Sequence, residues 1–334
     1  MDQAMKTRSH PVTRNLQIDT LKGLAILLVV IGHAIQSSTN SFDNNLIFRY
    51  IYSFHMPLFM FLSGYVTYGK EINLTKKFTS LVIPFVSWYL IGYVLAILFV
   101  PSSESFWQYI IKWIMSPDWG LWFLWAIFLN TIITKLVIYF VNPKSTYSDI
   151  VGMLIACILV NQIPTGLFGV GIIKWQLIFF GLGYLAPKYY LVLLQKTWIK
   201  LFSVGLFIVL GYFWRRTEAP YEWSYFINWI NPHNLPFLSS ILLYLYTILV
   251  PVTGILAAFS VTSLKLFTPI SYSLSWLGQR SFEVYVTHQK FLIVLGTTPF
   301  LILISSIIAT TSSLFTAYLL KRNILLKKML YGYR

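Results

Sequence analysis

A histidine lies inside the first long apolar run of the sequence, LKGLAILLVVIGHA, which extends from Leu21 to Ala34. Histidine has an ordinary pKa of about 6.5 and is mostly neutral near pH 7, so the ring of His33 could take a proton from an attacking hydroxyl. An ionisable group buried in lipid without a partner costs several kcal/mol, which is why such residues mark candidate functional sites. The alternative for His33 is a structural hydrogen bond to a neighbouring helix.

Acidic residues and a further histidine accompany two of the apolar runs. Asp19 precedes the first run and stands three residues before Lys22, so the two side chains can face each other on a helix. Glu283 and His288 lie in the segment SFEVYVTHQ near the other end of the chain. On one regular helix they would point about 140° apart, so each is expected to face a different partner.

Other polar and aromatic side chains are candidates for contacts with a substrate. The segment FHMPLFMFLSGY, from Phe54 to Tyr65, places His55 and Ser63 inside a second apolar run. Trp122 follows in a tryptophan-rich segment and could form a wall for a sugar or lipid. It has a second interpretation, as part of the aromatic belt that many membrane proteins carry at the lipid surface.

The composition predicts that most of the chain lies in lipid. Of the 334 residues, 57% are hydrophobic and only 10% are charged, whereas soluble domains carry about 25% charged residues. At 1.5 Å per residue, about ten apolar runs approach or exceed the length that crosses a bilayer: 21–37, 46–67, 81–100, 121–141, 149–163, 172–187, 199–214, 237–259, 282–297 and 299–320. We therefore predict an all-α, polytopic membrane protein with about ten transmembrane helices.

Lysine and arginine are distributed unevenly between the two sets of loops. With the N-terminus inside, the cytoplasmic loops hold about three times as many cations as the outer loops. This asymmetry predicts that both termini are cytoplasmic. The chain then divides into a cytoplasmic N-terminal segment (1–20), a transmembrane domain (21–320) and a basic cytoplasmic tail (321–334).

The sequence argues against several classes of function. The net charge of +15 could suit nucleic acid, but the basic residues are scattered between apolar runs, so we expect no nucleic-acid binding. The single cysteine, Cys157, allows no disulfide within the chain, and no two histidines have a ligand-like spacing, so no metal site is predicted. The loops are too short for a soluble catalytic domain, and any chemistry must take place in or at the membrane.

The chain resembles the acyltransferase-3 family of integral-membrane O-acyltransferases. The resemblance covers most of the chain and rests on the order and spacing of these segments: IDTLKGLAILLVVIGH, HMPLFMFLSGYV, LVIPFVSWYL, WFLWAIF and SFEVYVTHQ. It implies about ten transmembrane helices and the transfer of an acyl group, usually acetyl from acetyl-CoA, to hydroxyls of surface sugars and other envelope molecules. The expected location is the plasma membrane of a bacterial cell.

The resemblance also implies roles for individual residues. The family's catalytic histidine lies in the first span in an Arg-x10-His spacing, and that position matches His33. The arginine position matches Lys22, which keeps the positive charge but lacks the planar, bidentate fork of arginine. In place of the family's Arg-x-x-Arg pair, this chain has Lys76 and Lys77. We expect these lysines, together with Arg14, to bind the phosphates of acyl-CoA.

Two routes are open for His33. It could deprotonate the acceptor hydroxyl, or it could carry the acyl group briefly as an acyl-imidazole. Asp19, Glu283 or His288 could orient the ring or stabilise charge, and we place Glu283 first. The expected partners are membrane lipid, acyl-CoA and an envelope glycan acceptor.

A membrane transporter is the alternative function. Polar residues at depth and proline or glycine breaks within helices also occur in carriers, which would here export a sugar or a lipid-linked glycan precursor. The two halves of the chain show no symmetry, and the ionisable residues cluster in the first, second and ninth predicted spans. Both observations favour the transferase.

Overall fold

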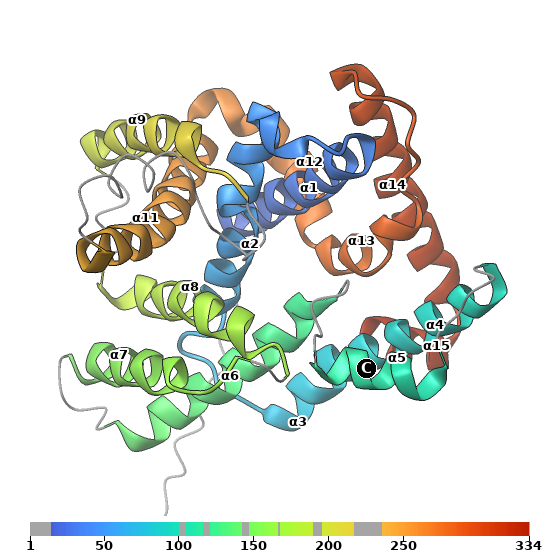
Figure 1. Ribbon diagram of the computed structural model, residues 1–334, viewed down its shortest axis with the longest axis horizontal. Coiled ribbons are helices and arrows are strands. Elements are labelled where there is room, and N and C mark those ends of the chain that lie inside the picture. The colour runs from blue at the N-terminus through green and yellow to red at the C-terminus, as the bar shows by residue number, and fades with distance from the viewer. Residues whose placement is uncertain are drawn as a thin grey trace, which may run out of the picture.

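The computed structural model describes residues 15–99, 105–115, 121–141, 147–165, 168–189, 196–216 and 236–333. These residues form helices joined by turns and contain no strand (Figure 1). The helices are α1 (Leu16–Ser38), α2 (Leu46–Tyr65), α3 (Leu74–Lys77), α4 (Ile83–Phe99), α5 (Phe106–Met115), α6 (Trp122–Phe140), α7 (Ser148–Asn161), α8 (Val170–Tyr189), α9 (Thr197–Phe213), α11 (Pro236–Thr262), α12 (Thr268–Gly278), α13 (Ser281–Thr287), α14 (Pro299–Leu320) and α15 (Ile324–Tyr331). Short turns η1 (Phe42–Asn44), η2 (Phe78–Val82), η5 (Lys265–Phe267) and η6 (His288–Lys290) complete them.

Seven helical segments within the described residues are long and apolar enough to cross a membrane. They are α1, α2, the continuous segment Leu74–Phe99, α6, α8, residues Ile241–Thr262 of α11, and α14. This confirms an all-helical, multi-pass membrane protein. Helices α7 and α9 match two further predicted spans but have only 14 and 17 residues. The total of ten spans and the cytoplasmic position of the termini stay predictions.

The structure differs from the prediction of a single span over 282–297. Helix α13 ends at Thr287, and after η6 the chain is non-helical as far as Thr298. Side chains satisfy part of the backbone that the break releases: the Nδ1 atom of His288 lies 2.8 Å from a carbonyl oxygen of α13, and the Ser305 hydroxyl donates to the Ile293 carbonyl at 2.7 Å. Irregular backbone is tolerated in membrane proteins where protein groups satisfy it. The apolar run alone does not reveal such a break.

Helix α1 runs through the middle of the molecule and contacts α2, α12, α13 and α14 (Figure 1). It begins at Leu16, five residues before the predicted span, and Asn15 caps it by accepting hydrogen bonds from two backbone N–H groups. Leu21, Ile26 and Val29 are fully buried. A helix enclosed by other helices is apolar on most of its faces, and its tight packing fixes the position of His33.

Glycines bring two pairs of helices into close contact. Gly23 of α1 faces Gly278 of α12, and Gly64 of α2 faces Gly183 of α8. A Cβ atom on any of these glycines would lie 1.9–2.0 Å from a carbonyl oxygen of the facing helix. Small residues at such positions let helix backbones approach within a membrane. The two contacts place α12 against α1 and α8 against α2.

Substituting alanine for Gly183 should therefore destabilise the protein. The added methyl carbon would lie 1.9 Å from the Phe61 carbonyl oxygen, and overpacking of this kind costs about 1–3 kcal/mol. Gly205→Ala is the matched control, because a methyl group there would meet no atom within 4 Å, and alanine favours helix by up to about 1 kcal/mol. Thermal unfolding in detergent should show a lower midpoint for Gly183→Ala alone. Equal midpoints would contradict the close α2–α8 contact.

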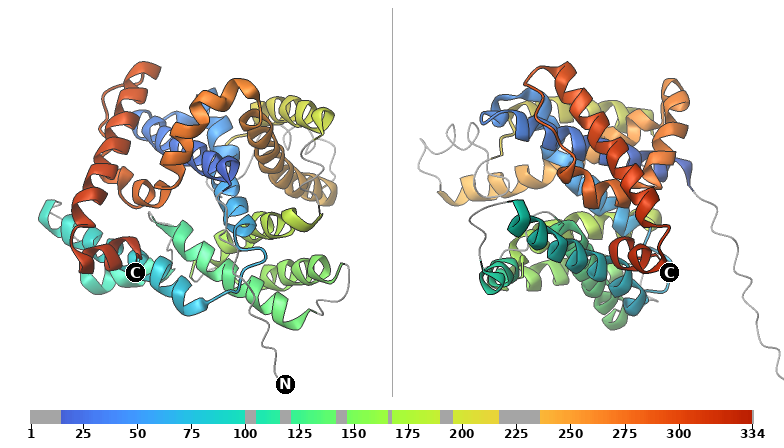
Figure 2. Two further views of the ribbon diagram at one scale, coloured as in Figure 1. Left: turned by 180° about the vertical axis from the view of Figure 1, so that it is seen from behind. Right: turned by 90° about the vertical axis from the view of Figure 1, so that its right-hand side faces the viewer.

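The last helix returns to the body of the molecule. After α14 the chain turns and α15 packs against α4, as both views in Figure 2 show. The indole N–H of Trp88 in α4 donates to the carbonyl oxygen of Leu330 at 2.9 Å. The segment predicted as a basic tail, 321–334, thus contains an ordered helix.

Candidate active site

His33 lies on the same face of α1 as Lys22. The two residues are eleven positions apart, which on an α-helix is about 20° beyond three full turns and about 16 Å along the axis. Both side chains are half-buried, whereas Ile26 and Val29 between them are fully buried. One face of α1 therefore carries a polar group near each end with apolar packing between.

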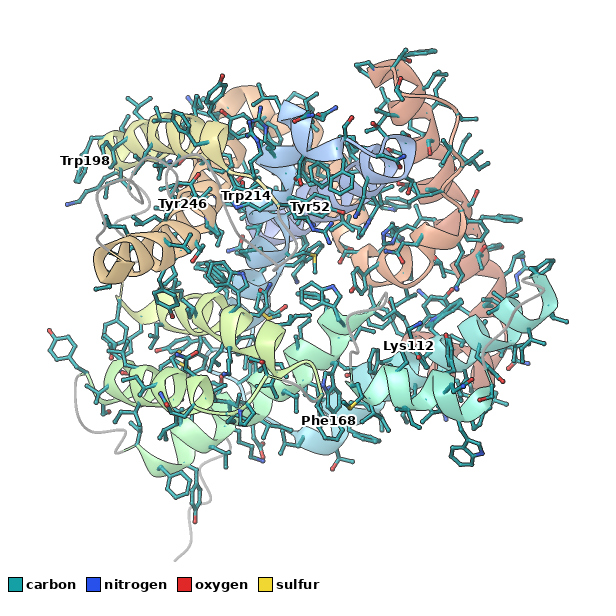
Figure 3. The ribbon with its side chains drawn as sticks, in the orientation of Figure 1. Tyr52, Lys112, Phe168, Trp198, Trp214 and Tyr246 are labelled. Atoms are coloured by element: carbon teal, nitrogen blue, oxygen red, sulfur yellow. The ribbon has the colours of Figure 1, made fainter. Side chains whose placement is uncertain are left out.

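A hydrogen-bond network assigns the proton on the His33 ring. The Tyr52 hydroxyl of α2 donates to Gln36 Oε1 at 2.6 Å and lies 3.2 Å from His33 Nδ1. A tyrosine hydroxyl has one proton, which Tyr52 donates to Gln36, so its oxygen accepts a hydrogen bond from the Nδ1–H group of His33. The neutral ring then carries its lone pair on Nε2. Tyr52 lies in the middle of the molecule beside α1 (Figure 3).

The Nε2 atom of His33 faces an exposed side chain. The amide nitrogen of Gln289, in η6, lies 3.3 Å from this atom and can donate to its lone pair. Gln289 is exposed. The basic nitrogen of His33 is therefore directed towards the accessible side of the site, where a hydroxyl could replace the amide.

A second imidazole lies beside the first. The ring centroids of His33 and His288 are 5.3 Å apart with the planes at 39°. His288 is only 1% exposed, and its Nδ1 is held by the carbonyl oxygens of Val284 and Tyr285 at 3.0 and 2.8 Å. Its Nε2 is buried without a hydrogen-bond partner. Buried polar atoms are seldom unpaired, so this lone pair is available to a group that becomes a donor during a reaction.

His55 contacts Tyr52 of the His33 network. Its ring centroid is 4.8 Å from that of Tyr52, and its Nδ1 lies 2.7 Å from the Ile51 carbonyl of the preceding helical turn. The guanidinium of Arg216 also lies near Tyr52, 5.1 Å from its ring centroid.

A cavity of about 250 Å³ lies towards the other end of α1. Three of the predicted site residues line it: Asp19, Lys22 and Ser63. Lys22 Nζ is 3.7 Å from Asp19 Oδ1, which confirms the predicted i, i+3 pair. Ser63 donates to the Phe59 carbonyl at 2.8 Å. The remaining lining residues come from α2, η2, α6 and the α12–α13 segment, and most are apolar.

Further lysines gather near this cavity. Lys77 ends α3 and is half-buried, and the charges of Lys22, Lys70 and Lys76 repel its ammonium group. Leu81, one helical turn after Lys77, lines the cavity. Positive charges concentrated around one opening favour an anionic ligand.

The remaining predicted site residues lie elsewhere. Glu283 pairs with Lys321 and Tyr333 rather than with His33. Trp122 is the first residue of α6, where its ring packs at 5.9 Å from that of Phe123, and it does not line the cavity. Arg14 lies outside the described residues. Among the described residues, no cluster of three or more histidine, cysteine or acidic side chains could hold a metal ion.

The sequence interpretation missed Tyr52, Gln36 and Gln289. Gln36 follows His33 by three residues and so shares its helix face, and Gln289 directly follows His288. Those spacings are visible in the sequence. The contact of Tyr52 with His33 is not, because it depends on how α1 and α2 pack.

The chain matches one family over almost its whole length. The family model described as an acyltransferase domain, that of the acyltransferase-3 family, matches residues 15–322. Two similar proteins are both named nodulation protein NolL. That of Sinorhizobium fredii (strain NBRC 101917 / NGR234) is 28% identical over 188 residues, which are 52% of this chain and 48% of the relative. That of Mesorhizobium japonicum (strain LMG 29417 / CECT 9101 / MAFF 303099) is 31% identical over 139 residues, 38% of this chain and 37% of the relative.

The matched segments thus span about half of each relative or less. No solved structure matches the chain. The family model covers both the cavity and the His33 network, and the protein is therefore a multi-pass membrane protein that belongs to the acyltransferase-3 family.

Proposed function

We propose that the protein moves an acetyl group from acetyl-CoA to a hydroxyl of a cell-envelope polysaccharide or glycoconjugate, with His33 as the reacting residue. The observation that carries this proposal is the network that leaves the lone pair of His33 on Nε2, facing exposed Gln289. That atom carries the lone pair of the ring, is held in place through Tyr52, and faces an exposed side chain. Family membership favours this function over an exporter.

The two ends of α1 suit the two substrates. The lysines around the cavity suit the phosphates of CoA, and the apolar lining suits its pantetheine arm. The thioester must then travel about 16 Å along α1 to reach His33. The acceptor reaches His33 from the side of Gln289. In a bacterial plasma membrane, with Lys22 towards the cytoplasm, the acyl group would cross the bilayer from donor to acceptor.

In the direct route His33 acts as a general base. The acceptor hydroxyl gives its proton to Nε2 while its oxygen attacks the thioester carbon. The new C–O bond forms, the C–S bond breaks, and the departing CoA thiolate takes the proton from the imidazolium. Throughout the reaction Tyr52 accepts a hydrogen bond from the Nδ1–H group of His33 and so keeps the ring oriented.

In the second route His33 carries the acyl group. Nε2 attacks the thioester carbon, a C–N bond forms and the CoA thiolate leaves. The acceptor oxygen then attacks the acyl-imidazole, and the C–N bond breaks as the C–O bond forms. The acceptor proton ends on the released imidazole or on the thiolate. Both routes require the lone pair on Nε2 of His33.

Transfer of label tests the proposal. Membranes with and without the protein are incubated with acetyl-CoA labelled in the acetyl group, and the envelope glycan fraction is then isolated. We expect label on the glycan only with the protein, released by mild base as an O-ester. Succinyl-CoA in parallel identifies the acyl group. If neither donor labels any envelope fraction and neither binds the purified protein, the proposal is wrong and the exporter gains support.

Replacing Lys22 with alanine should weaken donor binding. A hydrogen bond to a charged group contributes about 1.5–3 kcal/mol, so KM for acetyl-CoA should rise about tenfold or more while kcat changes little. Lys22→Arg should keep the affinity, since the positive charge stays. The control is Lys200→Ala, because Lys200 bonds to Ser263 and does not line the cavity. Equal KM values for all of these variants would remove Lys22 from the donor site.

A further inference from the structure

Glu283 is a buried carboxylate whose partners come from the end of the chain. It is 2% exposed, forms an ion pair with Lys321, and accepts a hydrogen bond from the Tyr333 hydroxyl at 2.8 Å. Both partners follow α14. A buried carboxylate that loses its cation leaves an uncompensated charge, which strongly destabilises the local structure.

The segment that provides these partners is itself held in place. Trp88 of α4 donates to the Leu330 carbonyl, and Gly332 ends α15 with a φ of +64°. A Cβ atom on Gly332 would lie 2.6 Å from Ser80, so the chain runs directly against η2 here. The ammonium of Lys321 also lies 4.3 Å from the ring centroid of Tyr333. Residues 321–333 thus join Glu283 to η2 and α4.

Glu283 is connected to the reacting residue through a short helix. It lies in the first turn of α13, which has only seven residues and leads directly into His288 and Gln289. Those two side chains adjoin the His33 ring. About 9 Å of helix separate Glu283 from Gln289. Helix α13 packs against α1 and α14, and Glu283 ties its first turn to residues 321–333.

We propose that residues 321–333 form a C-terminal latch that holds α13 through Glu283, and that Lys321 and Tyr333 are positioning residues for the reaction at His33. This inference rests on the proposed function. Glu283 acts here through the position of α13 and not on the reacting atoms. Removing a latch contact displaces His288 and Gln289 from His33 and so slows the chemical step. Donor binding changes less, because most residues that line the cavity lie outside α13.

Tyr333→Phe tests the latch with a minimal change. It removes one hydroxyl and keeps the ring over Lys321. We expect kcat for acyl transfer to fall about tenfold, with a much smaller change in the dissociation constant of acetyl-CoA. Tyr318→Phe is the matched control: this α14 hydroxyl accepts a hydrogen bond from Arg322 and does not bond to Glu283. The proposal is overturned if Tyr333→Phe behaves like the control, or if it reduces only the amount of folded protein while kcat per folded molecule stays normal.

Charge reversal gives a second test. Glu283→Lys and Lys321→Glu should each lower kcat more than Tyr333→Phe does, and the double reversal should regain part of the loss. A double variant that is no better than the worse single variant would contradict the pair. The melting temperatures of the native protein, the two single variants and the double variant report the coupling between Glu283 and Lys321 without a measurement of activity. If the native protein transfers no acyl group but the melting temperatures still show coupling, the proposed function fails and the contact stands.

Discussion

Replacing His33 with glutamine is expected to lower the rate of acyl transfer by about 10²–10⁴-fold, the usual contribution of a positioned acid or base. Glutamine stays polar and can bond to Tyr52, but its amide has no basic nitrogen to take a proton or an acyl group. Acetyl-CoA should bind as before, because the cavity lies about 16 Å away along α1. Single-turnover kinetics with matched protein amounts, together with a donor-binding isotherm, measure both quantities.

Tyr52 and Tyr50 provide a graded check of the same prediction. Tyr52→Phe removes the oxygen that accepts a hydrogen bond from the Nδ1–H group of His33, so the rate of acyl transfer should fall, but less than for His33→Gln. Tyr50→Phe, on the same helix, removes a hydroxyl that donates to the Ile208 carbonyl instead, and should leave the rate unchanged. Normal transfer by His33→Gln would make His33 a structural residue and remove the basis of the mechanism.

Replacing His288 with asparagine should have the next largest effect, a fall in kcat of about 10–100-fold. The asparagine amide can mimic Nδ1 and keep the hydrogen bonds to Val284 and Tyr285, while the buried Nε2 lone pair is lost. When His33 takes the proton of the acceptor, its ring becomes positively charged with its centroid 5.3 Å from that of His288. We expect the His288 lone pair to stabilise this charge, and a hydrogen bond to a charged group is worth about 1.5–3 kcal/mol. The loss should therefore appear in kcat and not in donor affinity.

His288→Gln separates the effect of the lone pair from an effect of packing. The end of a glutamine side chain reaches the position of Nε2 and can present an oxygen there, so this variant should retain more activity than His288→Asn. Thermal unfolding in detergent checks that both variants fold. The reverse order of activities, or full activity in His288→Asn, would show that the Nε2 lone pair plays no part.

Much of the architecture could be predicted from the sequence, because apolar runs in a membrane protein have few alternatives to helix. Helix α1 covers its predicted span, α2 covers all but the last two residues of its own, and the Asp19–Lys22 pair follows from i, i+3 spacing alone. The break in 282–297 was not predicted, although His288, Gln289 and Lys290 interrupt the apolar run there. Its interruption is supported by contacts with other residues, such as Ser305, that spacing does not reveal.

The candidate site was predictable where it depends on one helix and unpredictable where it depends on packing. His33 stands out as an ionisable residue in an apolar run, and Glu283 and His288 have separate partners, as their spacing indicates. The partners of Glu283 lie 38 and 50 residues further along the chain. The packing of α14 against α13 brings Lys321 close, and the return of α15 brings Tyr333 close. The sequence marks such residues as unusual without showing which contact explains them.

The measurement that tests the central claim most directly uses sealed, inside-out membrane vesicles with an envelope glycan enclosed. Acetyl-CoA labelled in the acetyl group is added outside, at the face predicted to carry Lys22. We expect label on the enclosed glycan with the native protein and almost none with His33→Gln at equal protein amount. Label confined to glycan outside the vesicles, or equal labelling by both proteins, would contradict transfer along α1 through His33.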